Sequence, residues 1–390
     1  MYYFKYIFIN ILETLLRTFP LPCKTGLIKI GKPDRNSPVF LTCNYHLTVV
    51  RVKRAVKGLN AYLLVANSRG INVWCSATGG HFTDHDVISV LKTSGIEKLV
   101  DHRNVILPQL AATGIESKLV SKKTGWKVIW GPVYAKDIPG FIDKNFTKST
   151  KMKVVEFPLP QRIEMAVMWA FPFSVIASLL ILPFNPQILV QLNILIWGWS
   201  LFVFISFPLY SEWLKREKRT ARFSKYTVIF DFSILPVILW FIFSSILITW
   251  ELLFSSFNLG TVLDWGFISL AVLLLLNIDL LGSTPTYKSG LHEDRYLKII
   301  LDKDKCKGAG YCDQVCPGNC FDVYKKTHSA RISREDKCVQ CGACIVQCPY
   351  DALYFKSPKG ETVSPESVRK YKLNLMGKRL VKVKQDVQNT

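Results

Sequence analysis

Four long apolar segments constrain this chain more than any other feature of its sequence. Met165–Leu182 and Gln187–Tyr210 contain no charged residue, whereas Tyr226–Trp250 contains one aspartate and Val262–Leu281 contains two. About 20 apolar residues cross the hydrocarbon core of a bilayer, so these segments predict four transmembrane helices. The fourth has only 14 uncharged residues between its aspartates, and a buried core helix is its alternative.

Charge in the connecting segments predicts how these helices are oriented. Residues 211–225, between the second and third segments, carry six basic and two acidic residues, while residues 183–186 carry none and residues 251–264 carry only acidic ones. The positive-inside rule places the basic segment in the cytoplasm. We therefore expect a multi-pass protein of the cytoplasmic (inner) membrane, with both soluble parts facing the cytoplasm.

The overall charge is strongly basic, with 50 lysines and arginines against 29 aspartates and glutamates, which gives a net charge of +21. A basic cytoplasmic face suits anionic membrane lipid. No basic stretch combines with stacking aromatic residues or a groove-reading motif, so we expect no nucleic-acid partner. Tyr2–Phe19 is apolar but carries Lys5, Glu13 and Arg17, which predicts an amphipathic interfacial helix, with a core helix as the alternative.

Short apolar runs alternate with helical patterns in the first part of the chain, which is typical of an α/β domain with a parallel, Rossmann-like sheet. The expected strands are Val39–Thr42, Ala61–Ala66, Lys98–Val100, Val105–Leu107 and Lys127–Trp130. Thr83–Ser94 predicts a helix, with a capping box between Thr83 and Asp86 and a left-handed cap at Gly95. Ligands of such sheets bind beyond the carboxyl ends of the strands. The loops of interest are residues 43–48, 67–80, 108–114 and 131–135.

The cysteines are unevenly distributed, because eight of the eleven lie between Cys306 and Cys348. Such clustering, in a chain where we expect no cleavable signal, indicates metal ligation in a reducing compartment rather than disulfides. The sequence Cys338-Val-Gln-Cys341-Gly-Ala-Cys344-Ile-Val-Gln-Cys348-Pro349 is the C-x2-C-x2-C-x3-C-P signature of iron–sulfur clusters. Zinc is the alternative metal, but its sites usually use separated pairs of ligands.

An upstream copy of this signature has Ala309 where the second cysteine is expected. In two-cluster ferredoxins the fourth cysteine of each motif binds the other cluster. The predicted ligands of a complete [4Fe–4S] cluster are therefore Cys316, Cys338, Cys341 and Cys344. Cys306, Cys312 and Cys348 remain for a second cluster, either [3Fe–4S] or [4Fe–4S] with a substitute ligand. Cys320 is the candidate substitute, and a buried thiol with no cluster is its alternative. The expected fold here is an α+β ferredoxin-like dicluster domain.

A single cysteine in the loops of the α/β domain stands in a distinctive setting. Cys75 lies in Gly-Ile-Asn-Val-Trp-Cys-Ser-Ala-Thr-Gly-Gly, residues 70–80, where small residues leave room for a large flat ligand. The simpler reading, a small buried hydrophobic residue, also applies to Cys23 and Cys43. The domain contains no glycine-rich dinucleotide or P-loop motif.

The segment around Cys75 resembles the cobalt-binding loop of corrinoid proteins related to the corrinoid iron–sulfur subunit of acetyl-CoA synthesis, and most of all the mercury-methylation corrinoid proteins. The resemblance extends through residues 42–45, 106–110 and 131–139, and covers roughly residues 20–160. It implies that Cys75 is the axial thiolate of a cobalamin-type corrinoid and the catalytic residue. The loop residues implied to hold the corrinoid are Asn44, Tyr45, Asn72, Val73, Trp74, Gly79, Gly80, Pro108, Gln109, Gly131 and Pro132.

The same resemblance implies a membrane-bound methyltransferase. A soft, electron-donating thiolate suits cobalt and would help a methyl group leave toward a soft acceptor such as Hg(II). Members of this family work with a small two-cluster ferredoxin, and this chain resembles the two fused, so that the ferredoxin re-reduces the cobalt. The implied partners are a methyl donor, either a corrinoid methyltransferase or a methyltetrahydrofolate-type compound, and a low-potential electron donor.

Two departures from the family pattern keep other functions open. Gly79 stands where the pattern has lysine, and no cysteine follows Cys348, whereas the partner ferredoxin ends in a cysteine pair. The alternatives are a corrinoid methyl carrier for an acceptor other than mercury and a membrane-anchored ferredoxin-type electron-transfer protein. The expected organisation is an amphipathic segment (1–19), the corrinoid-binding domain (20–160), four transmembrane helices (161–283), a linker (284–300), the dicluster domain (301–357) and a basic tail (358–390).

Overall fold

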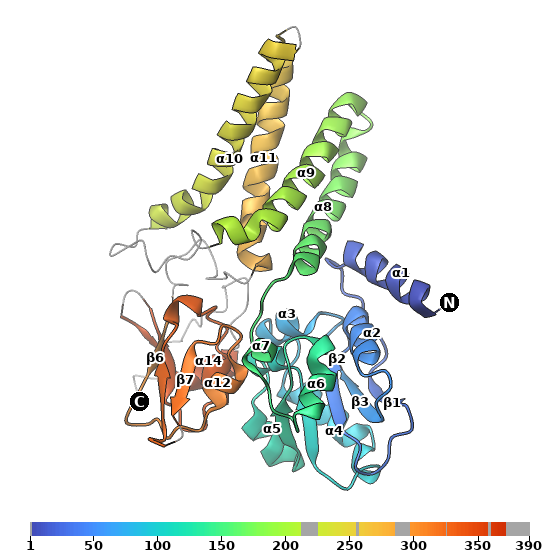
Figure 1. Cartoon of the computed structure of the whole chain (residues 1–390), viewed down its shortest axis with the longest axis vertical. Coiled ribbons are helices and arrows are strands. Elements are labelled where there is room, and N and C mark those ends of the chain that lie inside the picture. The colour runs from blue at the N-terminus through green and yellow to red at the C-terminus, as the bar shows by residue number, and fades with distance from the viewer. Residues whose placement is uncertain are drawn as a thin grey trace, which may run out of the picture. The chain divides into compact units, whose positions relative to one another are not determined.

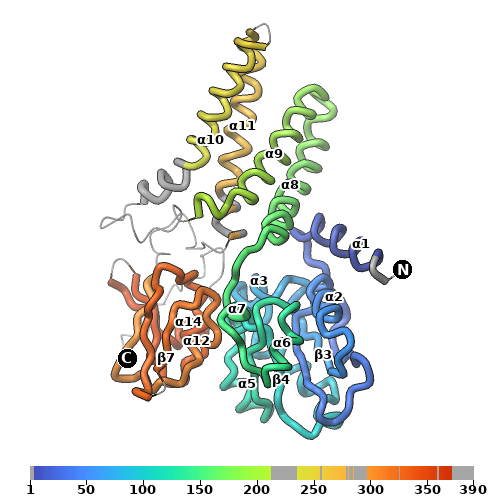
Figure 2. The backbone as a smooth tube through the Cα atoms, in the orientation of Figure 1, coloured from blue at the N-terminus to red at the C-terminus, as the bar shows by residue number. Residues whose placement is uncertain are grey.

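The computed structural model describes residues 2–211, 225–254, 257–284, 297–324, 326–357 and 360–371. These residues form two compact units. One unit comprises Met1–Tyr6, Pro20–Val155 and Asp294–Thr390, and it contains both the α/β domain and the cysteine-rich domain. The other comprises Ile7–Phe19 and Glu156–Glu293. Figure 2 follows the backbone from the α/β domain through four long helices to the cysteine-rich domain.

The α/β domain is built on a five-stranded sheet of order β1-β3-β2-β4-β5 (Figure 1). The strands are β1 (Gly26–Ile30), β2 (Val39–Cys43), β3 (Ala61–Ala66), β4 (Asn104–Leu107) and β5 (Lys127–Trp130). All neighbouring pairs are parallel except β1 and β3. The chain steps from β2 outward to β3 and then returns past β2 to β4, so the strand order reverses between β2 and β4. Such a switch point is where open α/β sheets bind ligands.

Both faces of this sheet are covered, which explains why its central strands are continuous apolar runs rather than alternating ones. Every residue of β2 and β3 is buried. Alternate residues of these strands enter two separate apolar clusters, with Leu41 and Leu64 in one and Phe40 and Leu63 in the other. The helices around the sheet are α2 (His46–Ala55), α3 (Val73–Thr78), α4 (Asp84–Thr93), α5 (Ser117–Thr124), α6 (Ile138–Asp143) and α7 (Thr150–Lys153), with 3-10 turns η1 (Ile96–Lys98), η2 (Gln109–Thr113) and η3 (Ala135–Asp137).

Four of the five expected strands are confirmed, and so is the helix over residues 84–93 with its Thr83–Asp86 capping box and left-handed Gly95. The expected strand Lys98–Val100 is wrong, because residues 96–98 form the 3-10 turn η1, which follows α4. A strand was also missed. β1 lies at the sheet edge, pairs antiparallel with β3 and is only half-buried, so its sequence lacks the continuous apolar run of the inner strands.

The second unit contains four helices that are long and apolar enough to cross a membrane. They are α8 (Leu159–Ile181), α9 (Pro186–Tyr210), α10 (Lys225–Phe254) and α11 (Leu259–Ser283). Polar side chains join neighbouring helices, as in the 2.8 Å hydrogen bond that Trp199 Nε1 donates to Ser269 Oγ. Such bonds satisfy polar groups that lipid cannot. The core-helix alternative for the fourth segment is not needed, since its apolar window is only one-third buried. Residues 212–224, which carry most of the basic loop used for orientation, lie outside the described residues.

The first helix, α1 (Tyr2–Leu15), exposes large apolar side chains, including Phe4 at 77% and Phe8 at 66%. A core helix would bury them. The interfacial position remains a prediction, and it agrees with this exposure.

The cysteine-rich domain combines two small sheets with three short helices. Its elements are β6 (Lys298–Leu301), α12 (Tyr311–Val315), β7 (Phe321–Tyr324), β8 (Ser329–Ile332), the turn η6 (Glu335–Lys337), α13 (Ala343–Gln347), β9 (Leu353–Lys356), β10 (Thr362–Val363) and α14 (Pro365–Tyr371). Three strands form a sheet of order β10-β9-β6, and β7 pairs with β8. The domain therefore begins before residue 301, and the first part of the expected basic tail is folded, because β10 and α14 belong to it. Residues 372–390 lie outside the described residues.

Candidate functional site

The two cysteine motifs fold in the same way. Each places a left-handed glycine, Gly310 or Gly342, immediately before a short helix, α12 or α13. The cysteine at the third motif position, Cys312 or Cys344, lies in the helix, and the one at the fourth position, Cys316 or Cys348, follows it. The two helices pack against each other. This local symmetry is what the crossed ligation of a two-cluster ferredoxin requires.

The cysteines gather into the two predicted sets. Burial, followed by the neighbouring thiols of Cys316, Cys341 and Cys338 and then by that of Cys312 in the other set, raises the pKa of Cys344 well above its usual value. Burial, followed by the thiols of Cys348 and Cys306, raises the pKa of Cys312 to about 12. Buried thiols disfavour the charged form, and iron ligation offsets that cost because the metal binds thiolates. The residues therefore fit two clusters, although their assignment as ligands remains a prediction.

The second set lines a pocket that encloses about 340 Å³, part of it open to solvent. Cys306, Cys312 and Cys348 lie in its wall together with Ala309, the residue at the position of the missing cysteine. Within the described part of the chain, no three His, Cys, Asp or Glu side chains are placed to hold a single metal ion. A zinc ion needs its ligands within about 2.3 Å of one centre. The pocket therefore holds the three cysteines and the alanine of one motif, and the metal they bind remains a prediction.

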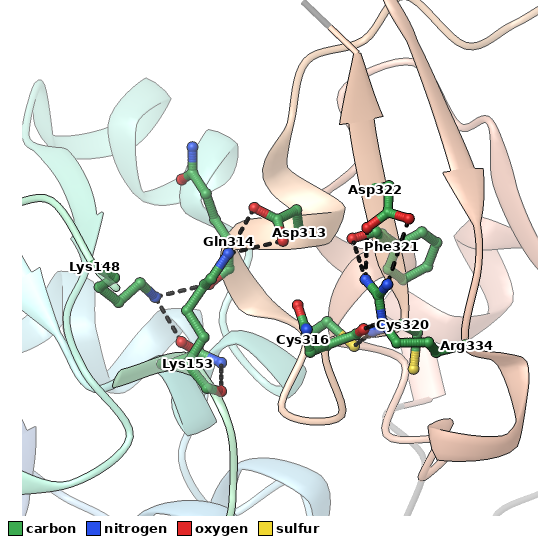
Figure 3. Close-up of polar contacts among 11 residues, drawn as sticks. Lys148, Lys153, Asp313, Gln314, Cys316, Cys320, Phe321, Asp322 and Arg334 are labelled. Carbon is green, nitrogen blue, oxygen red and sulfur yellow. Dashed lines mark hydrogen bonds and ion pairs between the residues drawn. The ribbon is translucent and has the colours of Figure 1, made fainter. Parts of the chain in front are cut away.

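Cys320 is not part of the second pocket, contrary to the expectation that it could be the substitute ligand. It is 1% exposed and lies beside Cys316 and Cys338, whose thiols hydrogen-bond with its own. Its backbone N–H donates to Cys316 Sγ at 3.3 Å, and its thiol lowers the pKa of Cys316 to about 7. Arg334 closes the adjoining hairpin by bonding Asp322 (Figure 3). Cys320 therefore belongs to the surroundings of the complete cysteine set.

Cys75 lies in α3, in the loop between β3 and α4, beyond the carboxyl end of β3. Asn72 caps this helix, and its Oδ1 accepts a 3.0 Å hydrogen bond from the Cys75 backbone N–H. Ser76 Oγ donates to Asn72 O at 2.6 Å, which secures the same turn. Cys75 is half-buried, whereas Cys43 is fully buried and burial raises its pKa. The reading as a small buried hydrophobic residue thus suits Cys43, and Cys75 retains access for a ligand.

Two loop residues implied to contact a corrinoid, Asn44 and Gln109, also bond to other parts of the protein, and their contact with a corrinoid remains a prediction. Asn44 is 5% exposed, and its Oδ1 accepts hydrogen bonds from the backbone N–H groups of Ser68 and Gly70 and from Ser68 Oγ. It therefore shapes the loop that leads to Cys75. Gln109 is completely buried. Its Nε2 donates a hydrogen bond to the backbone carbonyl oxygen of Lys153, and its Oε1 accepts one from Lys148 Nζ.

The remaining implied residues lie in the four loops that follow β2, β3, β4 and β5. Tyr45, Val73, Gly131 and Pro132 are buried, while Asn72, Trp74, Gly79, Gly80 and Pro108 are half-buried. The half-buried members of the Cys75 loop are the ones able to touch a large ligand. The chemistry of a half-exposed thiol, set among small residues at the sheet edge, fits a soft metal carried by a flat cofactor. This assignment is untested and remains a prediction.

A hydrogen-bonded interface joins the α/β domain to the cysteine-rich domain, and sequence reasoning missed it. Lys148 Nζ donates to Gln314 O at 2.7 Å (Figure 3), and to Gln109 Oε1 and Gly131 O at 2.6 and 3.1 Å. Lys153 forms an ion pair with Asp313. Isolated lysines and glutamines between motif residues carry no sequence signal for such a role, because their partners are far away in the chain.

Apolar contact continues this interface. Val315 and Ala343 of the cysteine-rich domain join the same apolar cluster as Leu107 and Ala111, and Cys341 packs against it. α3 packs against η2, and η2 packs against α13. The helix that carries Cys75 is therefore linked to the helix that carries Cys344 through one intervening turn.

Comparison with known proteins identifies two domains. Residues 14–142 match the family described as CO dehydrogenase/acetyl-CoA synthase delta subunit, and residues 305–362 match the 4Fe-4S dicluster domain. The chain thus joins a region similar to the first family to a 4Fe-4S dicluster domain.

The curated relatives match about a third of this chain. Subunit gamma of the acetyl-CoA decarbonylase/synthase complex from Archaeoglobus fulgidus is 36% identical over 129 residues, which is 33% of this chain and 27% of that protein. The subunit gamma from Methanothermobacter thermautotrophicus is 37% identical over 127 residues, 32% of this chain and 27% of that protein. The chain thus spans about a quarter of the length of these relatives.

Proposed function

We propose that this chain is a membrane-bound, corrinoid-dependent methyltransferase, resembling the mercury(II) methylation system, with its own electron supply. The observation that carries the proposal is the packing of the dicluster domain on the α/β domain, through η2, next to the helix of Cys75. The corrinoid would supply methyl transfer at its cobalt, and the clusters would supply the single electrons that keep the cobalt active.

The residues of this chain have distinct parts in the proposal. Cys75 would bind the cobalt as a thiolate, while Asn72 holds the Cys75 turn and Asn44 holds the approaching loop. Cys316, Cys338, Cys341 and Cys344 would hold one cluster, and Cys306, Cys312 and Cys348 the other. Tethering donor and acceptor in one chain raises their effective concentration for each other. The four apolar helices would anchor both domains to the cytoplasmic face of the inner membrane.

Corrinoid retention tests the proposal directly. We expect the full chain, purified in detergent, to retain a corrinoid when the host is supplied with cobalamin. Cys75→Ala should change the visible spectrum of the bound cobalt while the iron content stays the same. Cys23→Ala, which removes another half-buried cysteine of the same domain, should leave that spectrum unchanged. A chain that retains iron but no corrinoid would be a membrane-anchored electron-transfer protein instead.

The acceptor is decided by a separate experiment. A host that expresses the chain, supplied with Hg(II), should release methylmercury, and a host expressing Cys75→Ala should not. The second candidate is a methyl carrier for another acceptor, such as a thiol or a one-carbon partner. It is favoured by Gly79, where a Cβ would approach the Cys75 carbonyl oxygen to 2.8 Å, so this backbone does not accommodate the lysine of the family pattern without a shift. Bound corrinoid without methylmercury would select it.

A further inference from the structure

Gln347 uses its whole hydrogen-bonding capacity on the other domain. It is 5% exposed and lies at the end of α13, immediately before Cys348. Its Oε1 accepts from the backbone N–H and the Oγ of Ser117, at 3.2 and 2.8 Å. Its Nε2 donates to the carbonyl oxygens of Ala112 and Ile115, at 2.9 and 2.6 Å. A glutamine amide has two donors and two acceptor lone pairs, so all four are used.

This arrangement fixes an orientation as well as a contact. The partners of Gln347 come from η2 and from the residues that lead into and begin α5. We call these four hydrogen bonds the Gln347 clamp, and they hold α13 against η2, the turn that packs on α3. Arg369 reinforces it by lying 3.9 Å from the Glu116 carboxylate. A buried polar network with every member satisfied specifies one geometry, because any shift leaves several groups unpaired.

The interface brings one cysteine set toward the α/β domain. Cys341 packs against the apolar cluster of the α/β domain. Val315 and Ala343, which belong to that cluster, are the chain neighbours of Cys316 and Cys344. Three of the four cysteines in the complete set are therefore in the interface or next to it.

The other cysteine set lines a pocket of its own, although Cys312 and Cys348 are chain neighbours of the interface residues Asp313 and Gln347. Every residue that lines the pocket of Cys306, Cys312 and Cys348 belongs to the dicluster domain. The pocket opens to solvent, and Tyr350 at its rim is 49% exposed.

We infer that Gln347 clamps the dicluster domain so that electrons enter at the Cys306–Cys312–Cys348 cluster and leave through the Cys316–Cys338–Cys341–Cys344 cluster to the corrinoid site. A reduced low-potential one-electron carrier would be oxidised by one electron at the solvent-facing cluster. The same electron would pass to the second cluster and then to the cobalt, which is reduced by one electron. The rate of tunnelling falls steeply with distance, so the packed route through η2 is the favoured exit. This inference rests on the proposed function.

Amide hydrogen exchange tests the clamp without any corrinoid. We expect Gln347→Ala to speed the exchange of the Ser117 amide about tenfold, because it loses its acceptor. Ser117→Ala removes only the bond from Ser117 Oγ to Gln347 and leaves the cysteine-rich domain unchanged. It should therefore speed amide exchange over residues 112–116 by a smaller factor than Gln347→Ala does. Gln314→Ala removes an exposed glutamine from the same domain and is the matched control. Iron content should be the same in all variants. Unchanged exchange in Gln347→Ala would overturn the clamp.

Two spectroscopic measurements test the electron route. A dysprosium chelate in solution should broaden or relax the electron paramagnetic resonance signal of the Cys306–Cys312–Cys348 cluster more than that of the other cluster. Equal effects would overturn the assignment of the solvent-facing cluster. With titanium(III) citrate as reductant, the bound cobalt should be reduced at least fivefold more slowly in Gln347→Ala than in Gln314→Ala. An equal rate, with faster exchange, would overturn the route and leave the proposed function intact.

The two ideas fail in different ways. If the chain retains no corrinoid, the proposed function and the last step of the route both fall. The exchange and chelate measurements still decide whether the clamp and the solvent-facing cluster exist.

Discussion

The Nζ of Lys153 lies 2.8 Å from each carboxylate oxygen of Asp313, and this ion pair joins residues 160 positions apart in the chain. Lys153 ends α7 in the α/β domain, and Asp313 lies in α12 next to Cys312. Their side chains are 13% and 29% exposed, so solvent only partly screens the pair. The four long apolar helices separate the two domains in sequence, yet the folded chain brings Lys153 and Asp313 into contact.

Reversal of the Lys153 charge should loosen this contact. We expect Lys153→Glu to destabilise the docked unit by about 1–3 kcal/mol, because Asp313 then faces a like charge in a partly buried setting. The midpoint of thermal bleaching of the cluster absorbance in detergent would fall. Lys153→Glu combined with Asp313→Lys should recover at least half of the loss. Lys151→Ala, an exposed lysine of the same helix, is the control, and failure of the double variant to recover would argue against the pair.

Lys148 should make stability depend on pH. Burial, followed by the charge of Lys153, lowers the pKa of Lys148 to about 7, although Asp313 opposes the change. An unfolded lysine has a pKa near 10.4. Between about pH 7 and pH 10 the unfolded chain therefore binds more protons than the folded chain, and folding stability should rise with pH by at most about 1.4 kcal/mol per unit. Below pH 7 both states are protonated, and the cost of burying the charge remains in full.

The comparison with Lys148→Met isolates this effect. The variant lacks the titrating group but keeps Lys153 and Asp313, so common contributions cancel. The stability of the variant relative to the native chain should be greatest near pH 6 and should shrink as the pH rises to about 9. Thermal midpoints measured at several pH values provide the check. A difference that does not change with pH would show that Lys148 titrates normally.

Gly114 should be intolerant of any side chain. A Cβ there would lie 2.5 Å from Ala77 O, 2.7 Å from Phe82 O and 2.8 Å from Ala77 Cα, all of them backbone or Cα atoms. We expect Gly114→Ala to cost about 1–3 kcal/mol and to weaken corrinoid retention, because α3 must move away from η2. Gly140→Ala is the control, since its Cβ would meet only Met152 Cε at 3.4 Å. Equal thermal midpoints in the two variants would contradict the prediction.

The sequence predicted the inner strands and the long helices because their signals are local. β2 and β3 are apolar along their whole length, and α4 carries its own capping box, so neither depends on distant residues. β1 was missed because it is a half-buried edge strand, and its pairing with the distant strand β3 leaves no local signal in its sequence. The grouping of the cysteines into two motifs is also a local signal, and their assignment as cluster ligands remains a prediction.

The interface could not be predicted in this way. The residues around Gln347 in the sequence do not indicate whether its side chain faces solvent or another domain. Only the folded chain shows that it is buried against Ser117. Cys320 shows the same limit. The incomplete second set made Cys320 the candidate substitute ligand, whereas the turn before β7 places it beside Cys316 and Cys338.

Cys320→Ala should therefore affect the complete cluster and spare the other. Hydrogen bonds to ligand sulfur raise the reduction potential of a cluster, so loss of the Cys320 thiol should lower the potential of the Cys316–Cys338–Cys341–Cys344 cluster. Cys320→Ser keeps a donor and should shift the potential less. Redox titration followed by electron paramagnetic resonance measures both variants. Loss of iron from the other cluster in Cys320→Ala would restore Cys320 as a ligand there.

Ala309→Cys should complete the second ligand set. Ala309 lines the same pocket as Cys306, Cys312 and Cys348, and it occupies the position that Cys341 holds in the other motif. A fourth thiolate at that position should convert a labile or three-iron cluster into a stable four-iron one, since four cysteines hold such a cluster. Iron analysis should approach eight irons per chain, and the signal of an oxidised three-iron cluster should disappear. Ala309→Val adds bulk without sulfur and should leave the native iron content unchanged or lower. If Ala309→Cys gains no iron while Ala309→Val also retains its native content, the pocket is not a cluster site.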